Sequence, residues 1–324
     1  MARAAASYYA TRDAFGAAGD FTTSPEISQA FGECLGAWAA VVWDSMGRPD
    51  PVLLVELGPG RGTLMADALR AIASVAPEFH AALRVHLVDA SPRLVAVQRA
   101  RLGDRVAAWH GDIAALPSGP AIMLANEFFD ALPIRQFIRR GDAWRERAVA
   151  DGAFVEIAAE NAPPLPDHAP DGAVQEIGEA ARAVTGAIAA RLVGQGGALL
   201  ALDYGPAESG FGDSLQAMRA HAPADPLGPP GCVDVTAHVD FSALAAAARA
   251  AGAVAHGPLS QGLFLQRIGL GMRAGMLAAA DPRRAQEQMT AAQRLLAPEA
   301  MGRLFKALCL CHPALPTPPG FEIF

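Results

Sequence analysis

An apolar run that ends in an acid and then breaks into alternating glycines constrains the fold of this chain most. Residues 52–57 read Val-Leu-Leu-Val-Glu-Leu, which is typical of a strand buried on both faces of a parallel sheet. Gly58, Gly60 and Gly62 follow at a spacing of two, and a helix is expected to begin near Thr63. Glycines let the backbone approach a bound molecule, and the first turn of a helix directs free N–H groups toward it. The stretch therefore predicts a strand, a tight turn and a helix, with a ligand beside the turn.

The spacing of the glycines narrows the choice of ligand. The pattern is G-x-G-x-G, whereas dinucleotide folds carry G-x-G-x-x-G, and Glu56 stands near the end of the strand. This difference favours a nucleoside ligand without a pyrophosphate, such as S-adenosylmethionine. A nicotinamide or flavin site and a purely structural junction stay open on this motif alone. Glu56, Gly58, Gly60 and Gly62 are accordingly candidate cofactor-binding residues.

Composition limits the class of partner. The chain has 324 residues, of which 52% are hydrophobic and 18% charged, so it can bury a large core in one domain, with or without an elaboration. The formal net charge is −7, and no cluster of Lys and Arg rises above the background, which argues against a nucleic-acid partner. A basic peptide or protein substrate is easier to accommodate.

The cysteines and the apolar runs indicate whether the chain forms disulfides, binds a metal or spans a membrane. Cys34, Cys232, Cys309 and Cys311 are too few and too scattered for a disulfide framework, and the last two lack a second ligand pair for zinc. We therefore expect reduced cysteines and no metal. No apolar run reaches the ~18–20 residues of a membrane span, and no signal peptide opens the chain. A soluble cytoplasmic protein without membrane insertion is expected.

The order of the expected elements predicts an α/β protein with a doubly wound, mostly parallel sheet. Parallel strands are expected near residues 52–57, 83–88, 106–110, 121–125 and 198–202. Helices are expected near residues 27–46 with Ser24 as N-cap, 63–73, 92–102, 173–193, 242–251, 261–280, 282–296 and 298–302. A hairpin is expected near residues 134–149, extended by 154–158, and further strands near 254–258 and 304–311. Residues 206–240 lack periodicity and are predicted to form a long loop.

These elements divide the chain into four expected parts. Residues 1–48 form an N-terminal cap loop and helix, 49–205 a Rossmann-like core, 206–303 an insertion of loop and helices on the substrate side, and 304–324 the final strand and tail. The hydroxyl-rich segment around Thr22, ahead of the cap helix, is interpreted either as a structural cap or as a lid over a ligand. Thr22 is therefore a candidate substrate contact.

Acids follow the second and third strands of the predicted core. Asp89 ends the second strand, where a carboxylate captures ribose hydroxyls in doubly wound folds. It lies 27 residues after Gly62, whereas a nicotinamide fingerprint places its acid roughly 20 residues on, so the dehydrogenase interpretation is disfavoured. Asp112 and Ile113 follow the third strand, where an acid and an aliphatic side chain suit an adenine.

The fourth strand ends in the second stretch that carries chemistry, Asn126-Glu127-Phe128-Phe129-Asp130. The carboxyl ends of strands in open α/β sheets line the ligand crevice, so Asn126 and Glu127 are expected to face the group that receives the transfer. Two phenylalanines between two acids favour a flat cation such as a guanidinium. In the alternative interpretation, Phe128 and Phe129 belong to the core and Asp130 caps a helix.

The predicted loop at residues 206–240 contains two histidines and ends near an acid, Asp240. His221, His238 and Asp240 either act in acid–base chemistry or hold the loop by hydrogen bonds, and the structural role is favoured for histidines without a matched partner. His238 is kept as a candidate substrate contact.

Several strings, taken together and in order, resemble the MidA-like protein arginine methyltransferase family over nearly the whole chain. They are Tyr8-Tyr9, the segment 19–28, the glycine stretch 55–64, the segment 126–133, Asp203-Tyr204-Gly205, the segment 234–241 and the closing segment 297–306. The family carries further residues ahead of its tyrosine pair, whereas only Met1–Ser7 precede it here, so we expect either an incomplete cap over the cofactor or a misassigned start codon. Asn126 stands where some members have a His, and it suits hydrogen bonding rather than proton transfer.

The resemblance implies a class I S-adenosylmethionine-dependent methyltransferase with an N-terminal helical cap and a C-terminal helical and loop insertion. It implies S-adenosylmethionine as cofactor and a protein substrate, a subunit of NADH dehydrogenase (complex I), in the bacterial cytoplasm or, for a eukaryotic source, the mitochondrial matrix. A homodimer is one expected assembly. Glu127, Asn126 and Asp130 are the expected catalytic residues, with Phe128, Phe129, Thr22 and His238 contacting the substrate.

Two alternatives of other classes remain. The first is an assembly chaperone that keeps the fold and binds a respiratory-complex subunit, with residues 206–240 as its contact surface. Asp89 and Asp112 argue against it, because a protein that only binds has no physical need for both acids. The second is a dehydrogenase, which the glycine spacing disfavours.

Overall fold

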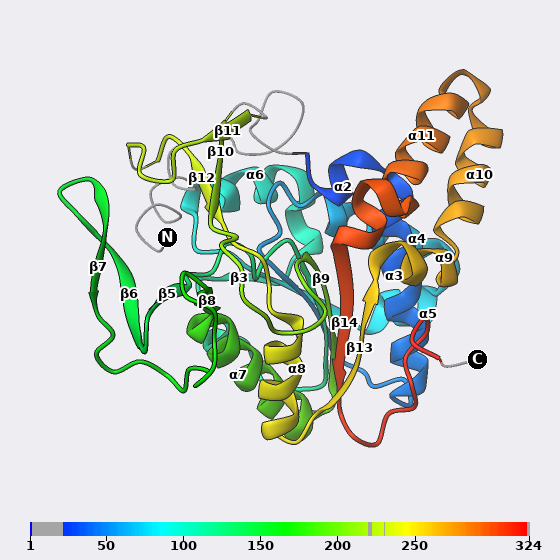
Figure 1. Ribbon diagram of the computed structural model, residues 1–324. Helices are drawn as coiled ribbons and strands as arrows, with labels where there is room; N and C mark the ends of the chain where they lie inside the picture. The colour runs from blue at the N-terminus through cyan, green and yellow to red at the C-terminus, as the bar shows by residue number, and fades with distance from the viewer. Residues whose placement is uncertain (2–21, 220–221, 230, 323–324) are drawn as a thin grey trace.

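A seven-stranded sheet forms the centre of the computed structural model, which describes residues 1, 22–219, 222–229 and 231–322 (Figure 1). The strand order is β13-β14-β9-β4-β1-β2-β3. Five strands are parallel: β1 (Val52–Leu57), β2 (Leu83–Val88), β3 (Ala108–His110), β4 (Ala121–Asn126) and β9 (Gly197–Tyr204). At one edge β14 (Phe305–Cys311) runs antiparallel to β9, and β13 (Val254–Ser260) runs antiparallel to β14. The predicted doubly wound, mostly parallel sheet is therefore confirmed.

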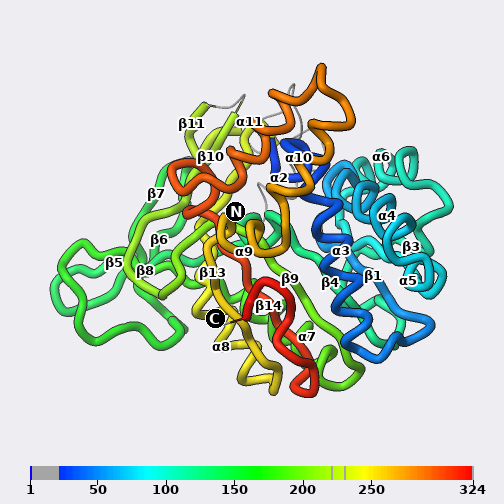
Figure 2. Tube along the Cα trace, turned by 90° about the vertical axis from the view of Figure 1, so that its right-hand side faces the viewer, coloured from blue at the N-terminus to red at the C-terminus, as the bar shows by residue number. Residues whose placement is uncertain are grey.

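Helices cover both faces of this sheet, which explains why its central strands are mainly apolar, with buried polar residues only near their carboxyl ends. Ile122 and Leu124 of β4 face a core shared with α3 (Gln29–Ser45) and α4 (Thr63–Val75). Met123 and Ala125 alternate with them and face a core shared with α7 (Glu179–Gln195) and α8 (Phe241–Ala250). Because side chains alternate along a strand, the two cores lie on opposite faces. The two helical layers can be followed in Figure 1 and Figure 2.

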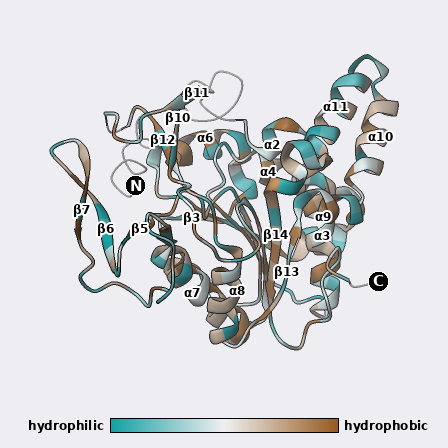
Figure 3. Cartoon of the chain, in the orientation of Figure 1, coloured by the Kyte–Doolittle hydropathy of each residue, from teal (hydrophilic) through white to brown (hydrophobic). Residues whose placement is uncertain are grey.

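The remaining helices of the core surround the first half of the sheet. They are α2 (Ser24–Ile27), α5 (Pro77–Ala82) and α6 (Pro92–Leu102). Apolar colouring follows the central strands, whereas polar residues are frequent on the outlying elements (Figure 3). Among the described residues, no helix is both long enough and apolar enough to span a membrane.

Three groups of elements are added to the core. A four-stranded antiparallel sheet is formed by β5 (Arg135–Arg140), β6 (Ala143–Ala150), β7 (Ala153–Ala158) and β8 (Val174–Ile177). A three-stranded sheet is formed by β10 (Gln216–Arg219), β11 (Ala222–Ala224) and β12 (Asp234–Thr236). A helical group comprises α9 (Gln261–Arg267), α10 (Leu270–Ala280), α11 (Ala285–Leu296) and η4 (Pro298–Gly302). The hairpin of β6 and β7 and the pair α10 and α11 project at opposite sides of Figure 1.

The structure corrects three sequence-based expectations. Residues 173–193 were expected to be helical throughout, but β8 pairs with β5 before α7 begins, so tertiary pairing overrides local propensity. Residues 206–240 were expected to be a loop, but they contain β10, β11 and β12, whose three or four residues are too few to show a period. Ser24 was expected to be an N-cap, but Thr23 precedes α2, and the Oγ of Ser28 accepts a hydrogen bond from Ala30 N to cap α3.

Some predicted features lie outside the described residues. Tyr8, Tyr9, Asp20, Phe21 and His221 belong to this group.

Candidate active site

The loop after β1 has the backbone conformation that its glycines predicted. Gly58, Gly60 and Gly62 have φ of +61°, +51° and +74°, a region that L side chains rarely adopt. A Cβ added to Gly58 would lie 3.1 Å from Cδ2 of Phe128. The turn after β1 and the turn after β4 are therefore packed against each other, and Gly62 leads directly into α4.

Glu56 places a buried carboxylate directly ahead of this loop. The residue is 3% exposed, and among the described residues its Oε2 has no hydrogen-bond partner. Burial raises the pKa of Glu56 to about 8, although a backbone hydrogen bond from Met65 lowers it. A buried carboxylate with a free oxygen is stabilised by a cation placed beside it. This orphaned oxygen fits a positively charged ligand at the glycine loop.

A glutamine that carried no signal in the sequence connects the loop to Asp89. Gln98 Nε2 donates to Gly60 O at 2.9 Å and to Asp89 Oδ2 at 2.7 Å. Its Oε1 accepts a hydrogen bond of 3.1 Å from Trp109 Nε1. Asp89 Oδ1 accepts from Ser91 N at 2.8 Å, and burial raises the pKa of Asp89. The structure thus holds Asp89 in a defined position beside the glycine loop.

Asp112 and Ile113 follow β3, which is the edge strand of the sheet. Asp112 is exposed, and its Oδ1 accepts a hydrogen bond of 2.8 Å from Ala114 N. Ile113 is half-buried and packs against the core that contains Phe129. Glu56 is the penultimate residue of β1, and Asp89 and Asp112 follow β2 and β3, so the three acids lie near the carboxyl ends of neighbouring parallel strands.

Glu127 has a strained backbone and a carboxylate tied to α2. Its φ is +50°, which is uncommon for a residue other than glycine. Oε1 accepts hydrogen bonds from Ser24 N at 3.0 Å and from Asn126 Nδ2 at 3.1 Å. Burial raises the pKa of Glu127. Among the described residues Asn126 Oδ1 is buried without a partner, so this end of β4 still offers an acceptor to a ligand.

Asp203 at the end of β9 organises the turn that follows Glu127. Its Oδ2 accepts backbone hydrogen bonds from Phe128, Phe129 and Asp130, at 3.1, 2.9 and 3.2 Å, and its Oδ1 accepts from Tyr204 N at 2.9 Å. Burial raises the pKa of Asp203 to about 7, although these backbone hydrogen bonds lower it. Burial and the charge of Asp203 also raise the pKa of Asp130 well above its usual range. The sequence contained Asp203 in a motif, but nothing indicated this anchoring role.

Phe128 and Phe129 have different surroundings. Their rings meet edge to face with centroids 5.2 Å apart. Phe129 is 3% exposed and belongs to the core, as the alternative interpretation expected, whereas Phe128 is half-buried against Gly58. Thr22 is half-buried near the start of α2, and its neighbour Thr23 lines the cavity beside the glycine loop.

A small cavity lies between the two turns. It is lined by Thr23, Pro25, Glu26, Glu56, Gly58, Pro59, Gly60, Arg61, Thr63, Leu64, Asn126 and Glu127. Glu26 of α2 accepts a hydrogen bond from Thr63 at the start of α4, so α2 covers this space. The volume is about 40 Å³. We call it the donor cavity.

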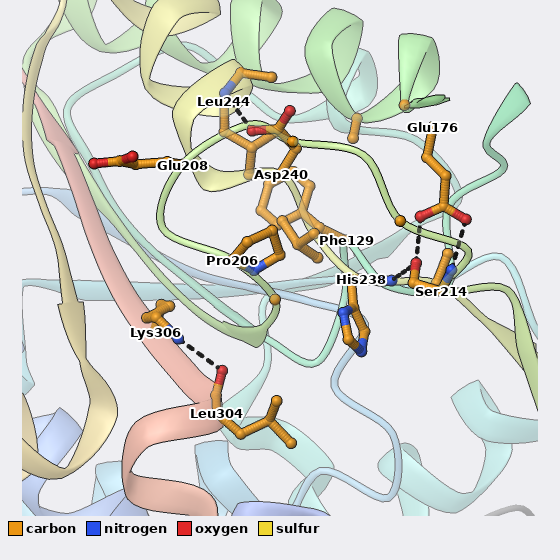
Figure 4. A pocket seen from close by; sticks show the side chains of 18 of the residues that line it. Phe129, Glu176, Pro206, Glu208, Ser214, His238, Asp240, Leu244, Leu304 and Lys306 are labelled. Carbon is orange, nitrogen blue, oxygen red and sulfur yellow. Dashed lines mark hydrogen bonds between the residues drawn. The ribbon is translucent and has the colours of Figure 1, made fainter. Parts of the chain in front are cut away.

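A much larger cavity of about 650 Å³ lies beyond the end of β9, and we call it the distal cavity (Figure 4). Phe129 contributes to its wall, so the turn after β4 separates the two cavities. His238 is exposed at its surface, where its ring meets Tyr204 edge to face and its backbone N donates to Ser214 Oγ at 2.8 Å. Among the described residues, no group of three or more His, Cys, Asp and Glu side chains is arranged to hold a metal ion.

Comparisons with known proteins bear on the ligand of the donor cavity. The sequence profile of a family of S-adenosyl-L-methionine-dependent methyltransferases matches residues 34–259. The chain is 35% identical to the mitochondrial protein arginine methyltransferase NDUFAF7 homolog of Drosophila melanogaster, covering 94% of this chain and 78% of the relative. It is 34% identical to the mitochondrial protein arginine methyltransferase NDUFAF7 of Homo sapiens, covering 94% and 76%.

A solved structure resembles nearly the whole chain. It is a protein from Burkholderia thailandensis bound to S-adenosyl-homocysteine, with a TM-score of 0.80 and 27% identity over 95% of this chain and 84% of that one. A second, native structure from the same organism gives a TM-score of 0.78 and 26% identity, over 98% and 89%. The ligand of the first is what remains of S-adenosylmethionine once its methyl group has been transferred.

Proposed function

Because this chain belongs to the family of S-adenosyl-L-methionine-dependent methyltransferases that matches it, we propose that it methylates an arginine side chain of a protein substrate. The relatives named protein arginine methyltransferases support this acceptor. When bound, S-adenosylmethionine supplies an electrophilic methyl group on a cationic sulfur. The N–C bond to the arginine forms as the S–C bond breaks, and the nitrogen releases one proton.

The observation that carries the proposal is the placement of Glu127. Its carboxylate stands at the end of β4, lines the donor cavity and is held by Ser24 and Asn126. A carboxylate in this position orients a guanidinium through charge-assisted hydrogen bonds. Because burial raises the pKa of Glu127, the same group can accept the released proton. Catalysis then consists mainly of positioning the acceptor nitrogen beside the methyl group.

We assign the donor to the residues around the glycine loop. Gly58, Gly60 and Gly62 admit its methionine portion, and Glu56 lies beside its positive charge. We assign the ribose hydroxyls to the Asp89 carboxylate, which Gln98 and Ser91 hold by hydrogen bonds, and the adenine to Asp112 and Ile113.

We assign the acceptor to the end of β4 and the turn after it, whose Asn126 and Glu127 face the glycine loop across the donor cavity. Glu127, Asn126 and Asp130 surround the guanidinium, and Phe128 and Phe129 shape its pocket. Thr22 and His238 contact the flanking substrate. In this proposal residues 1–48 cover the site, 49–205 bind the donor, 206–303 supply the substrate side, and 304–324 complete the sheet.

The wider assignment rests on the family resemblance. We propose a subunit of NADH dehydrogenase (complex I) as the protein substrate and a homodimer as the assembly. The curated relatives are mitochondrial proteins. We therefore propose the mitochondrial matrix for a eukaryotic source and the cytoplasm for a bacterial one.

The experiment that tests this function uses labelled S-adenosylmethionine. The purified chain is incubated with the labelled donor and an extract that contains complex I subunits, and labelled proteins are identified by mass spectrometry. We expect label on an arginine nitrogen of one subunit. Label confined to another residue type would overturn the arginine assignment. A partner captured without any transfer, independently of the donor, would favour the assembly chaperone instead.

A further inference from the structure

The distal cavity is not required by the donor assignment, and its walls come from segments far apart in the chain. Phe129 follows β4, Pro206 follows β9, Leu244 belongs to α8, and Leu304 and Lys306 lie near the start of β14. Figure 4 shows these side chains around one hollow. A volume of about 650 Å³ falls in the range of ~300–1,000 Å³ that is usual for ligand pockets. The cavity is therefore large enough to bind part of a substrate.

The interior of the cavity is mainly apolar. Phe129 and Leu244 are 3% and 2% exposed, and Leu132, Val239 and Ala243 line the same space. An apolar side chain entering here would leave water for a surface of carbon atoms, which is the main source of favourable binding free energy.

Two carboxylates of the wall already have partners within the chain, whereas among the described residues Nε of Arg182, which also lines the cavity, is buried without a hydrogen-bond partner. Glu176 accepts hydrogen bonds from Gln136 Nε2 at 2.7 Å and Ser214 N at 3.0 Å. Asp240 accepts from Ala243 N at 2.9 Å and from Ser209 Oγ. These carboxylates therefore do not require a polar ligand.

Lys306 of the wall also has hydrogen-bond partners within the chain. Exposed charged side chains lie at the rim of the cavity. Lys306 Nζ donates to the backbone carbonyls of Arg303 and Leu304, at 2.6 and 3.0 Å. The side chains of Glu208, Glu299 and Arg303 are exposed and include both signs of charge. An apolar centre inside a polar rim is the pattern of energetically important protein contacts.

The turn after β4 lies between the transfer site and the distal cavity and contributes residues to both. Glu127 lines the donor cavity, and Phe129, two residues later, lines the distal cavity. Two residues span at most ~7 Å between Cα atoms, which is comparable to the length of an arginine side chain. A substrate whose arginine reaches Glu127 thus places its neighbouring residues at the mouth of the distal cavity.

We propose that the distal cavity binds a large apolar side chain of the protein substrate, aromatic or branched aliphatic, within a few residues of the methylated arginine. This inference rests on the proposed arginine methylation and names the sequence feature that the same site selects. Specificity then comes from an apolar anchor next to the arginine rather than from charge.

The test uses matched arginine peptides and two variants of α8. One peptide set carries Phe or Leu at positions two to four on either side of the arginine, and the control set carries Ser there. Ala243→Trp fills the distal cavity, whereas Ala246→Trp places the same side chain at an exposed position of the same helix that does not line it. Binding is measured by fluorescence anisotropy in the presence of S-adenosylhomocysteine, and methyl transfer is measured separately.

For the unmodified chain we expect the best apolar peptide to bind about 10- to 100-fold more tightly than its Ser counterpart, as burial of one large side chain predicts. Ala243→Trp should abolish this preference while the affinity for S-adenosylhomocysteine stays unchanged, and Ala246→Trp should retain it. A milder variant, Ala243→Leu, serves if the tryptophan prevents folding.

Two results separate failure of this inference from failure of the proposed function. Methylation of arginine with an equal preference for both peptide sets would overturn the apolar anchor and leave the arginine assignment standing. Binding of apolar peptides that Ala243→Trp abolishes, without arginine methylation of any peptide, would overturn the assignment of the acceptor. A preference that survives in folded Ala243→Trp protein would place the anchor elsewhere and overturn the inference.

Discussion

The backbone nitrogen of Ser24 donates a hydrogen bond of 3.0 Å to Oε1 of Glu127, a residue 103 positions later in the chain. This bond joins α2 to the turn after β4, where Glu127 has a left-handed backbone with φ of +50°. Glu26 of α2 also accepts a hydrogen bond from Thr63 at the start of α4. One short helix therefore contacts both the loop assigned to the donor and the carboxylate assigned to the acceptor.

Glu127→Gln removes the negative charge of this side chain and keeps its size and shape. The amide oxygen of Gln can still accept from Ser24 N, so α2 should keep its contact with the turn after β4. We therefore expect the affinity for S-adenosylmethionine to stay within about threefold. Methyl transfer should fall by at least about 100-fold, because the negative charge that stabilises the guanidinium is lost. Calorimetry gives the first quantity and incorporation of labelled methyl groups gives the second.

Glu160→Gln is the matched control for this variant. Glu160 is exposed beyond β7, so the same change there should leave donor affinity and transfer unchanged. Full transfer by Glu127→Gln would remove Glu127 from the proposed mechanism.

Gly58→Val should abolish donor binding. Valine at φ of +61° is strained, and its first side-chain atom would lie 3.1 Å from the Phe128 ring in the loop assigned to the donor. We expect no heat of binding for S-adenosylmethionine in a protein that retains its circular dichroism spectrum.

Gly47→Val controls for the backbone strain. Gly47 has φ of +82°, with open space around it and no part in either cavity. The Gly47→Val substitution should cost about 1–2 kcal/mol of stability, and the variant should bind S-adenosylmethionine with normal affinity. If Gly58→Val bound S-adenosylmethionine normally, the glycine loop would not be the donor site.

The sequence predicted the parts of this fold that depend on local pattern. The run 52–57, the three glycines and the start of α4 all stand where periodicity and turn chemistry put them. The acids at strand ends share one edge of the sheet because parallel strands bring their carboxyl ends together. For the same reason Asn126 and Glu127 lie beside the glycine loop.

The parts that the sequence did not reveal depend on contacts between distant residues. Gln98 stands on a helix with no motif around it, and only the folded chain brings it to Gly60. The three backbone hydrogen bonds to Asp203 exist because β9 lies beside β4 in the sheet. The strand β8 forms because the edge of β5 is available to it, which local propensity does not express.

Asp203→Asn should destabilise the chain and disturb transfer more than donor binding. The amide can offer one oxygen as acceptor, whereas the carboxylate serves Phe128, Phe129 and Asp130 with one oxygen and Tyr204 with the other. Leaving buried N–H groups without an acceptor costs about 1–3 kcal/mol, and more where the acceptor was charged. We expect a loss of about 2–4 kcal/mol in the free energy of unfolding in urea.

Asp171→Asn provides the comparison for that loss. Asp171 is exposed and accepts a single backbone hydrogen bond, from Gly141 N at 2.8 Å. Its replacement should cost less than about 1 kcal/mol. Equal stability losses for the two variants would contradict an anchoring role for Asp203.

Glu56→Gln should change how stability depends on pH. Burial raises the pKa of Glu56 from 4.5 to about 8, so the folded state favours the protonated form. Its contribution to stability is fully present below about pH 4.5 and is lost as the pH rises through about 8. The Gln variant cannot ionise, and its free energy of unfolding should therefore rise relative to that of the unmodified chain between pH 5 and pH 9, by a difference on the order of a few kcal/mol. If the two proteins differed in stability by the same amount at pH 5 and at pH 9, the Glu56 carboxyl would have an ordinary pKa.

Saturating S-adenosylmethionine should reduce the pH dependence of the stability of the unmodified chain, since a positive charge beside Glu56 lowers the pKa of this residue. The pH dependence of the Gln variant should stay unchanged when the same ligand is added.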